Sequence, residues 1–208
     1  MSQVDNQAIA IKLHRASEQQ EADNKTMFGF WVYLMTDCVL FASLFATFAV
    51  LHNNTFGGQS AHQLFSMPYA LSETLVLLTS SFTCGMAILA AQNSNKRLVL
   101  FWLSITFLLG LSFLVLELHE FSKFVAIGDS WRRSGFLSAY FVLVSTHGLH
   151  ITIGLLWILT MIYRVYKTGF NRMTTRQLTL MSLFWHFLDL IWIFIFSVVY
   201  LISGGLAV

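Results

Sequence analysis

The chain has 208 residues, of which 56% are hydrophobic and only 11% charged, and its formal net charge is +2. Soluble globular domains carry roughly a quarter charged residues, so this composition excludes an ordinary soluble domain and predicts a membrane protein. The small net charge, with no basic cluster on a polar face, also excludes nucleic acid as a partner.

Five apolar stretches follow a polar N-terminal tail at residues 1–27 and predict five transmembrane helices. They lie at 28–51, 69–91, 98–118, 136–162 and 178–203. Each is long enough to cross a hydrocarbon layer of about 30 Å, and lipid requires helices because it offers backbone groups no hydrogen-bond partners. The sequence therefore predicts an all-α integral membrane protein with a single five-helix domain at 28–208. Pro68 suits the first turn of the second helix, and Gly169 separates the last two.

The distribution of lysine and arginine predicts how the helices are oriented. Most of the twelve basic residues lie in the N-terminal tail and in the second and fourth connections, whereas Lys123, Arg132 and Arg133 lie in the third connection. Basic residues next to membrane helices tend to stay in the cytoplasm. We therefore expect a cytoplasmic N-terminus and a C-terminus on the outer side.

Ionisable side chains inside the predicted helices are few, and most come in pairs three residues apart, which lie on one helix face. The pairs and the two single residues are Glu117 with Glu120, His147 with His150, His186 with Asp189, and Asp37 and Glu73 alone. Each such group costs about 2.5 to 3.5 kcal/mol near the middle of a membrane helix, so each requires a partner or a purpose.

A central set of these residues lies near mid-depth in the predicted helices and comprises Asp37, His147, His150, His186 and Asp189. The main interpretation is an interhelical hydrogen-bonded cluster that fixes how the helices pack. The HGLH stretch also suits a metal or haem site, because it presents two imidazoles one turn apart. Proton transfer is the third interpretation, and the spacing alone does not choose among them.

An outer set of acidic residues lies toward the outer ends of the second and third predicted helices and comprises Glu73, Glu117 and Glu120. These carboxylates suit either neutralisation of Arg132 and Arg133 in the neighbouring connection, or contact with lipid headgroups. The functional alternative is that one of them binds a lipid or feeds a proton path.

Small residues four apart, such as Ser81 with Gly85 and Gly148 with Thr152, are typical of close helix packing in membranes. Cys38 and Cys84 lie singly within apolar stretches and are expected to be small core residues rather than a disulfide or a thiolate metal site. No phosphate-binding loop, dinucleotide fingerprint or nucleophile with an adjacent base is present, so we expect no catalytic residue in this chain.

Two long motifs resemble a known family. SGFLSAYFVLVSTHGLHITIGLLW at 134–157 and FWHFLDLIWIFIFSVVYLIS at 184–203 resemble the last two helices of subunit III of haem-copper terminal oxidases. FGFWVYLMTDCVLFASLFATFAVL at 28–51 and LELHEF at 116–121 are similar to earlier helices of the same family. The five-helix form with a short polar head is most similar to the branch of cytochrome bo type ubiquinol oxidases, and the resemblance covers nearly everything after residue 27.

The resemblance implies a non-catalytic subunit of a proton-pumping complex that oxidises ubiquinol and reduces dioxygen in the bacterial inner membrane. It implies that haems and copper belong to subunit I, that this chain contacts subunit I directly alongside subunits II and IV, and that a V-shaped bundle holds phospholipid in a cleft. The positions that match the family, to which the resemblance assigns structural or lipid-contacting roles, are Asp37, Glu117, His147, His150, His186 and Asp189. The alternatives are subunit III of a cytochrome c oxidase, a free-standing transporter or proton channel, and a haem-binding membrane cytochrome.

Overall fold

The computed structural model describes residues 2–51, 67–127 and 135–202, which are helical except for short turns at 93–95 and 169–171. The helices are α1 (Ser2–Leu51), α3 (Met67–Gln92), α4 (Lys96–Ile127), α5 (Gly135–Thr168), α6 (Arg172–Ile195) and the π-helix η1 (Phe196–Ile202). Within these ranges, five helices are long and apolar enough to cross a membrane, which confirms the predicted number.

The helices extend beyond the predicted apolar stretches because polar residues at their ends continue the backbone hydrogen bonding. The α4 helix begins at Lys96, and α5 continues to Thr168. The polar residues at the N-terminus are also helical as part of α1, where exposed Glu21 and Lys25 lie one turn apart with a carboxylate–ammonium distance of 3.9 Å. Such exposed pairs contribute only about 0.3 to 0.5 kcal/mol each.

The chain forms two compact units, Met1–Cys38 and Val39–Val208. The described part of the first unit is a single helical segment, namely α1 as far as Cys38. The second unit contains the rest of α1 and all later helices. The predicted boundary between a polar tail and a membrane domain at residue 27 stays a prediction.

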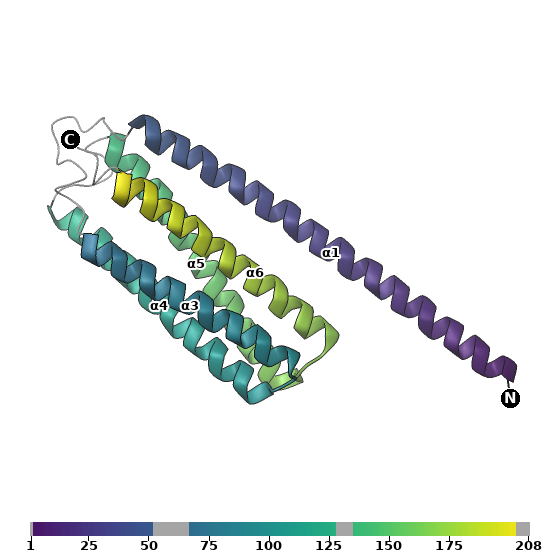
Figure 1. The fold of residues 1–208 in the computed structure, drawn as a ribbon. Coiled ribbons are helices and arrows are strands. Elements are labelled where there is room, and N and C mark those ends of the chain that lie inside the picture. Colours follow the sequence, from purple (N-terminus) through teal and green to yellow (C-terminus); the bar gives the residue numbers. More distant parts are fainter. Residues whose placement is uncertain (1, 52–66, 128–134, 203–208) are drawn as a thin grey trace. The chain divides into compact units, whose positions relative to one another are not determined.

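Helices α3, α4, α5 and α6 form a four-helix bundle within the second unit (Figure 1). Contacts join α3 to α4, α4 to α5, α5 to α6 and α6 back to α3, so each helix packs against two neighbours. The last turns of α1 contact the same bundle: Phe41 lies against His150 of α5, and Phe48 against Phe136 of the same helix.

Short turns fix the antiparallel order of neighbouring helices. Gly169 ends α5 with a φ of +70°, a conformation in which a side chain is strained, and its N–H donates to the Val165 carbonyl at 3.1 Å. Asn171 then begins α6, because its side-chain oxygen accepts from the Met173 N–H at 3.2 Å as an N-cap. The predicted break at Gly169 is confirmed, and Pro68 lies in the first turn of α3 as expected.

Candidate functional site

Two buried tryptophans of α6 form hydrogen bonds to α3 in the interior of the bundle. Trp185 and Trp192 lie two turns apart on one helix face, and both are 1% exposed. The Trp185 indole N–H donates to the Ser80 hydroxyl of α3 at 3.1 Å, and the Trp192 N–H donates to the Thr74 hydroxyl of α3 at 3.2 Å. Because each buried donor finds a partner on another helix, these bonds fix both the distance and the register between α6 and α3.

Two glycines make room for the Trp185 ring between α4 and α5. A Cβ added at Gly110 would lie 2.7 Å from the Trp185 ring and 2.9 Å from Leu155. A Cβ added at Gly154 would lie 3.0 Å from the opposite edge of the same ring. Trp185 therefore contacts all three other helices of the bundle, and its neighbours have no space for larger residues.

The two histidines of the HGLH stretch pack against aromatic rings. His147 is completely buried, with its ring centroid 5.2 Å from Trp192 and 6.0 Å from Phe113. Among the described residues neither of its ring nitrogens has a hydrogen-bond partner. His150 lies 5.3 Å from Phe41, and its Nδ1 is 2.7 Å from the Thr146 carbonyl one turn earlier. This pair therefore joins α5 to the last turns of α1 and to the Trp192 side of α6.

The structure separates the remaining members of the predicted central set. Asp189 is only 6% exposed, and neither of its carboxyl oxygens has a hydrogen-bond partner among the described residues. His186 is exposed instead, and its Nδ1 is 2.7 Å from the Ser182 carbonyl of its own helix. Asp37 belongs to the other compact unit, where it hydrogen-bonds Tyr33 one turn earlier. A single cluster of all five residues stays a prediction.

The outer acidic residues are brought together inside the bundle and not at its surface. Glu73, Glu117 and Glu120 are 0%, 2% and 5% exposed, and the carboxyl groups of Glu73 and Glu117 both interact electrostatically with Glu120. The Tyr140 hydroxyl of α5 donates to Glu120 at 3.1 Å. Carboxyl groups this deeply buried in the chain are not positioned to contact lipid headgroups. Their predicted partners Arg132 and Arg133 lie outside the described residues.

A glycine also makes room for one of these carboxyl groups. A Cβ added at Gly148 would lie 2.5 Å from one oxygen of Glu117 and 3.0 Å from the other. The carboxyl group of α4 therefore rests directly on the backbone of α5 at this point. The contact between the Glu117 carboxyl group and Gly148 sets how closely these two helices approach.

No three His, Cys, Asp or Glu side chains in the described ranges come together in a way that could hold a metal ion. The imidazoles in this part of the chain instead contact aromatic rings and carbonyl oxygens. The arrangement can hold helices in register.

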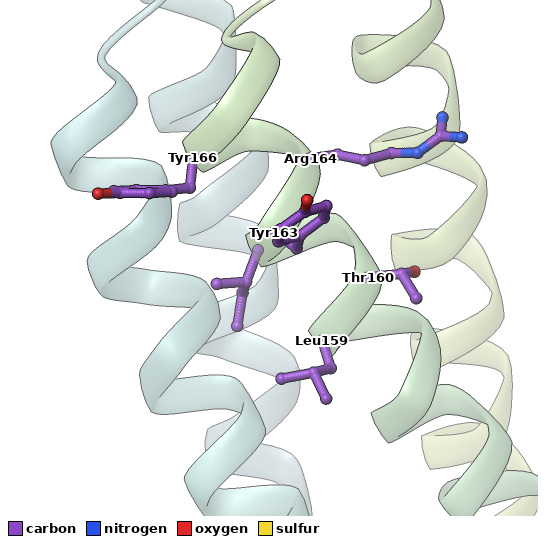
Figure 2. Close-up of a pocket in the computed structure, with 6 residues that line it drawn as sticks. Leu159, Thr160, Tyr163, Arg164 and Tyr166 are labelled. Atoms are coloured by element: carbon purple, nitrogen blue, oxygen red, sulfur yellow. The ribbon is translucent and has the colours of Figure 1, made fainter.

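A further feature lies on the outward face of α5, near its C-terminal end. A cavity of about 710 Å³ is lined there by residues of one helix. Leu159 and Tyr163 project into it, whereas Arg164 extends toward α6, where it hydrogen-bonds Gln177 (Figure 2). Lys167 lies over the Tyr163 ring, with its Nζ 5.7 Å from the centroid. The cavity is therefore largely apolar, and Lys167 lies beside one of its lining residues, Tyr163.

The sequence reasoning missed the tryptophan contacts and the glycines that accommodate them. Trp185 and Trp192 lie seven residues apart, which places them on one face of α6. That spacing indicates a shared buried face. The positions of their hydroxyl partners on α3 could not be predicted from the sequence, because they depend on how the two helices pack.

Comparisons with known proteins agree on one family. Residues 14–204 match the family model described as cytochrome c oxidase subunit III. The chain is 47% identical to cytochrome bo(3) ubiquinol oxidase subunit 3 of Pseudomonas aeruginosa, over 92% of this chain and 91% of the relative. It is 46% identical to the protein of the same name from Buchnera aphidicola subsp. Baizongia pistaciae, over 86% and 92%. It is also 47% identical to cytochrome c oxidase subunit 3 of Bacillus sp. strain PS3, over 88% of each chain.

Proposed function

Because this chain belongs to the cytochrome c oxidase subunit III family, we propose that it is the non-catalytic subunit III of a proton-pumping ubiquinol oxidase. In this proposal it stabilises subunit I, which carries the haems and copper, and it works beside subunits II and IV in a bacterial inner membrane. Ubiquinol oxidation and dioxygen reduction belong to the whole complex. Relatives named as ubiquinol oxidase subunits, at 47% and 46% identity, support the choice of electron donor.

The observation that carries the structural role is the use of buried polar groups for helix packing. Trp185 and Trp192 donate to hydroxyl groups of α3, and His147 is enclosed by aromatic rings. Groups used in this way hold a scaffold in one arrangement and are not arranged around a substrate. A rigid helical bundle suits a subunit that supports the lateral surface of a larger membrane partner.

Purification of the oxidase from cells with and without this chain tests the proposal. We expect the chain to co-purify with the oxidase, and the preparation lacking it to start at a similar turnover rate but to lose activity faster. Failure to co-purify, or equal operating lifetimes of the two preparations, would contradict the proposal. Comparing ubiquinol with cytochrome c as donor separates this function from the alternative supported by the relative named as a cytochrome c oxidase subunit.

The proposal includes orientation and lipid. The N-terminus lies in the cytoplasm and the C-terminus on the outer side, as the distribution of basic residues favours. The V-shaped bundle with a lipid cleft rests on family membership alone. The cavity on α5 supports phospholipid binding at a different place, because an acyl chain suits its largely apolar lining and a phosphate group suits Lys167 beside Tyr163.

Native mass spectrometry of the intact oxidase tests the lipid part. Replacing Lys167 with glutamine removes one charge at the cavity and is expected to reduce retained anionic phospholipid. Lys25→Gln is the matched control, because it removes an exposed charge that lies next to Glu21 on α1. Equal lipid retention in the two variants would refute a headgroup contact at Lys167.

A further inference from the structure

A groove lies in the bundle between α3 and α6. Its volume is about 420 Å³. It is lined by Ser81, Phe82, Gly85, Met86 and Leu89 of α3 and by His186 of α6. The groove is apolar except for its serine and histidine, and it lies along the middle and following turns of the membrane-spanning part of α3.

His186 is the first reason to expect a protein occupant. It lies near the middle of the spanning segment Arg172–Val199 and is exposed to the groove. Within the described residues its hydrogen bonds go only to Ser182 of its own helix, through Nδ1. Hydrocarbon offers no hydrogen-bond partner, and polar side chains at this depth normally face a protein neighbour or a water-filled cavity. Acyl chains therefore leave the outer edge of this imidazole unsatisfied, whereas a helix with a polar side chain satisfies it.

Gly85 is the second reason. A Cβ added at this position would meet nothing within 4 Å, in contrast to the collisions at Gly110 and Gly154. Glycine in a helix interior costs about 1 kcal/mol relative to alanine, and packing among the described residues gives no reason for that cost at Gly85. Close approach of another helix does give one, because small residues let two backbones come together in a membrane. Ser81, one turn earlier, continues the same small surface.

Asp189 is the third reason, because it adds a buried polar group directly behind the groove. It is one turn from His186 on α6 and is only 6% exposed, and its carboxyl group lies near Ser81, which lines the groove. Neither carboxyl oxygen has a hydrogen-bond partner among the described residues. A polar side chain of an incoming helix that reaches His186 therefore meets a surface that already contains a hydroxyl and a carboxyl group. The polar part of the groove lies at one depth, as expected for contact with a single side chain.

We propose that this groove docks one transmembrane helix of another oxidase subunit, which packs closely on Gly85 and Ser81 and presents a hydrogen-bonding side chain to His186. The inference rests on the proposed function, because it requires that the chain works within a multi-subunit oxidase. It adds which face of the chain meets a partner and what chemistry that partner carries.

Photo-cross-linking in the complete oxidase, in native membranes, tests the inference. Phe82, which is 65% exposed in the groove, is replaced with p-benzoyl-phenylalanine. The control carries the same substitution at Leu108, which is 62% exposed on α4. We expect an adduct with another oxidase subunit from position 82. An adduct at position 82 with lipid only, or with a second copy of this chain, overturns the inference, as does the same subunit adduct at equal yield from both positions.

A second measurement uses leucine substitutions that fit the fold of the chain. Gly85→Leu fills the groove without an intrachain collision at Cβ, and Ser104→Leu adds the same side chain at an exposed position of α4 at similar depth. We expect Gly85→Leu to reduce the fraction of oxidase that retains this chain in detergent by about tenfold, a shift of about 1.4 kcal/mol. We expect Ser104→Leu to leave that fraction unchanged. His186→Leu is expected to reduce it about threefold, in line with an interhelical hydrogen bond in a membrane.

The outcomes separate this inference from the proposed function. If the chain co-purifies with the oxidase while Gly85→Leu is retained as well as Ser104→Leu, the groove is not the docking surface and the proposed function stands. If the unmodified chain does not co-purify with an oxidase at all, the proposed function and the inference both fail.

Discussion

Substitution of Gly110 by alanine tests the packing around Trp185 most sharply. The added Cβ would lie 2.7 Å from the indole ring, about 1 Å inside the usual carbon–carbon contact distance. The ring has little freedom to move, because its N–H donates to Ser80 and its other edge lies against Gly154. Overpacking of this kind costs about 2 to 3 kcal/mol, and the better helix propensity of alanine returns about 1. We expect a net loss of about 1 to 2 kcal/mol in the free energy of unfolding.

The assay is unfolding of the full-length chain in mixed micelles by increasing SDS, followed by tryptophan fluorescence. Gly85→Ala is the matched control, because its added Cβ meets nothing, and it is expected to be neutral or to raise the free energy of unfolding by up to about 1 kcal/mol. Trp185→Phe removes the ring atoms that collide. We expect it to cost about 1 kcal/mol less in the Gly110→Ala background than alone. Equal stability of Gly110→Ala and Gly85→Ala would refute the reasoning.

Three further predictions concern the same bundle. Trp192→Phe and Thr74→Val each remove one partner of the hydrogen bond between α6 and α3. Each is expected to lower the free energy of unfolding by about 1 kcal/mol, and the double variant by less than the sum. A double-mutant cycle in the SDS assay checks this. Gly148→Ala is expected to cost about 1 to 2 kcal/mol in that assay because the Cβ displaces the Glu117 carboxyl group, and a free energy of unfolding at or above that of the unmodified chain would contradict this. Asp189→Leu removes a buried carboxyl group near Ser81 and is expected to lower the yield of assembled oxidase on a native gel; unchanged yield would remove the case for a structural carboxyl group.

Hydropathy, together with the positions of proline and glycine, predicted the architecture well. Five apolar stretches correspond to five membrane-length helices. Pro68 lies in the first turn of α3, where its missing N–H donor is tolerated, and Gly169 lies after α5 with a positive φ. The predicted helix ends were too short, because hydropathy marks the apolar part of a helix, while backbone hydrogen bonds continue through polar residues such as Lys96 and Thr168. The π-helical end of the last span, η1, had no signal in hydropathy.

The polar positions were found from the sequence, but their groupings were not. His186 and Asp189 are three residues apart, which is about 300° and leaves about 60° between them on the helix surface. The edge of the buried face passes between them, so Asp189 is enclosed and His186 is exposed to the groove. Spacing along one helix cannot locate that edge, because it depends on where α3 packs.

The outer carboxyl groups illustrate the same limit. Their depth near the ends of α3 and α4 was readable from the sequence, and it suggested contact with headgroups or with Arg132 and Arg133. Tyr140 and the Gly148 backbone of α5 cover Glu120 and Glu117, respectively, from a neighbouring helix. Contacts among three helices cannot be predicted from the spacing along one helix, because they depend on how the helices pack.

The central claim is that this chain supports an oxidase without taking part in its redox chemistry. The most direct test is the optical spectrum of the oxidase, measured per subunit I, before and after this chain is removed in detergent. The account predicts the same haem absorbance in both preparations and no haem absorbance in the released chain. Haem that leaves with the released chain would contradict the account.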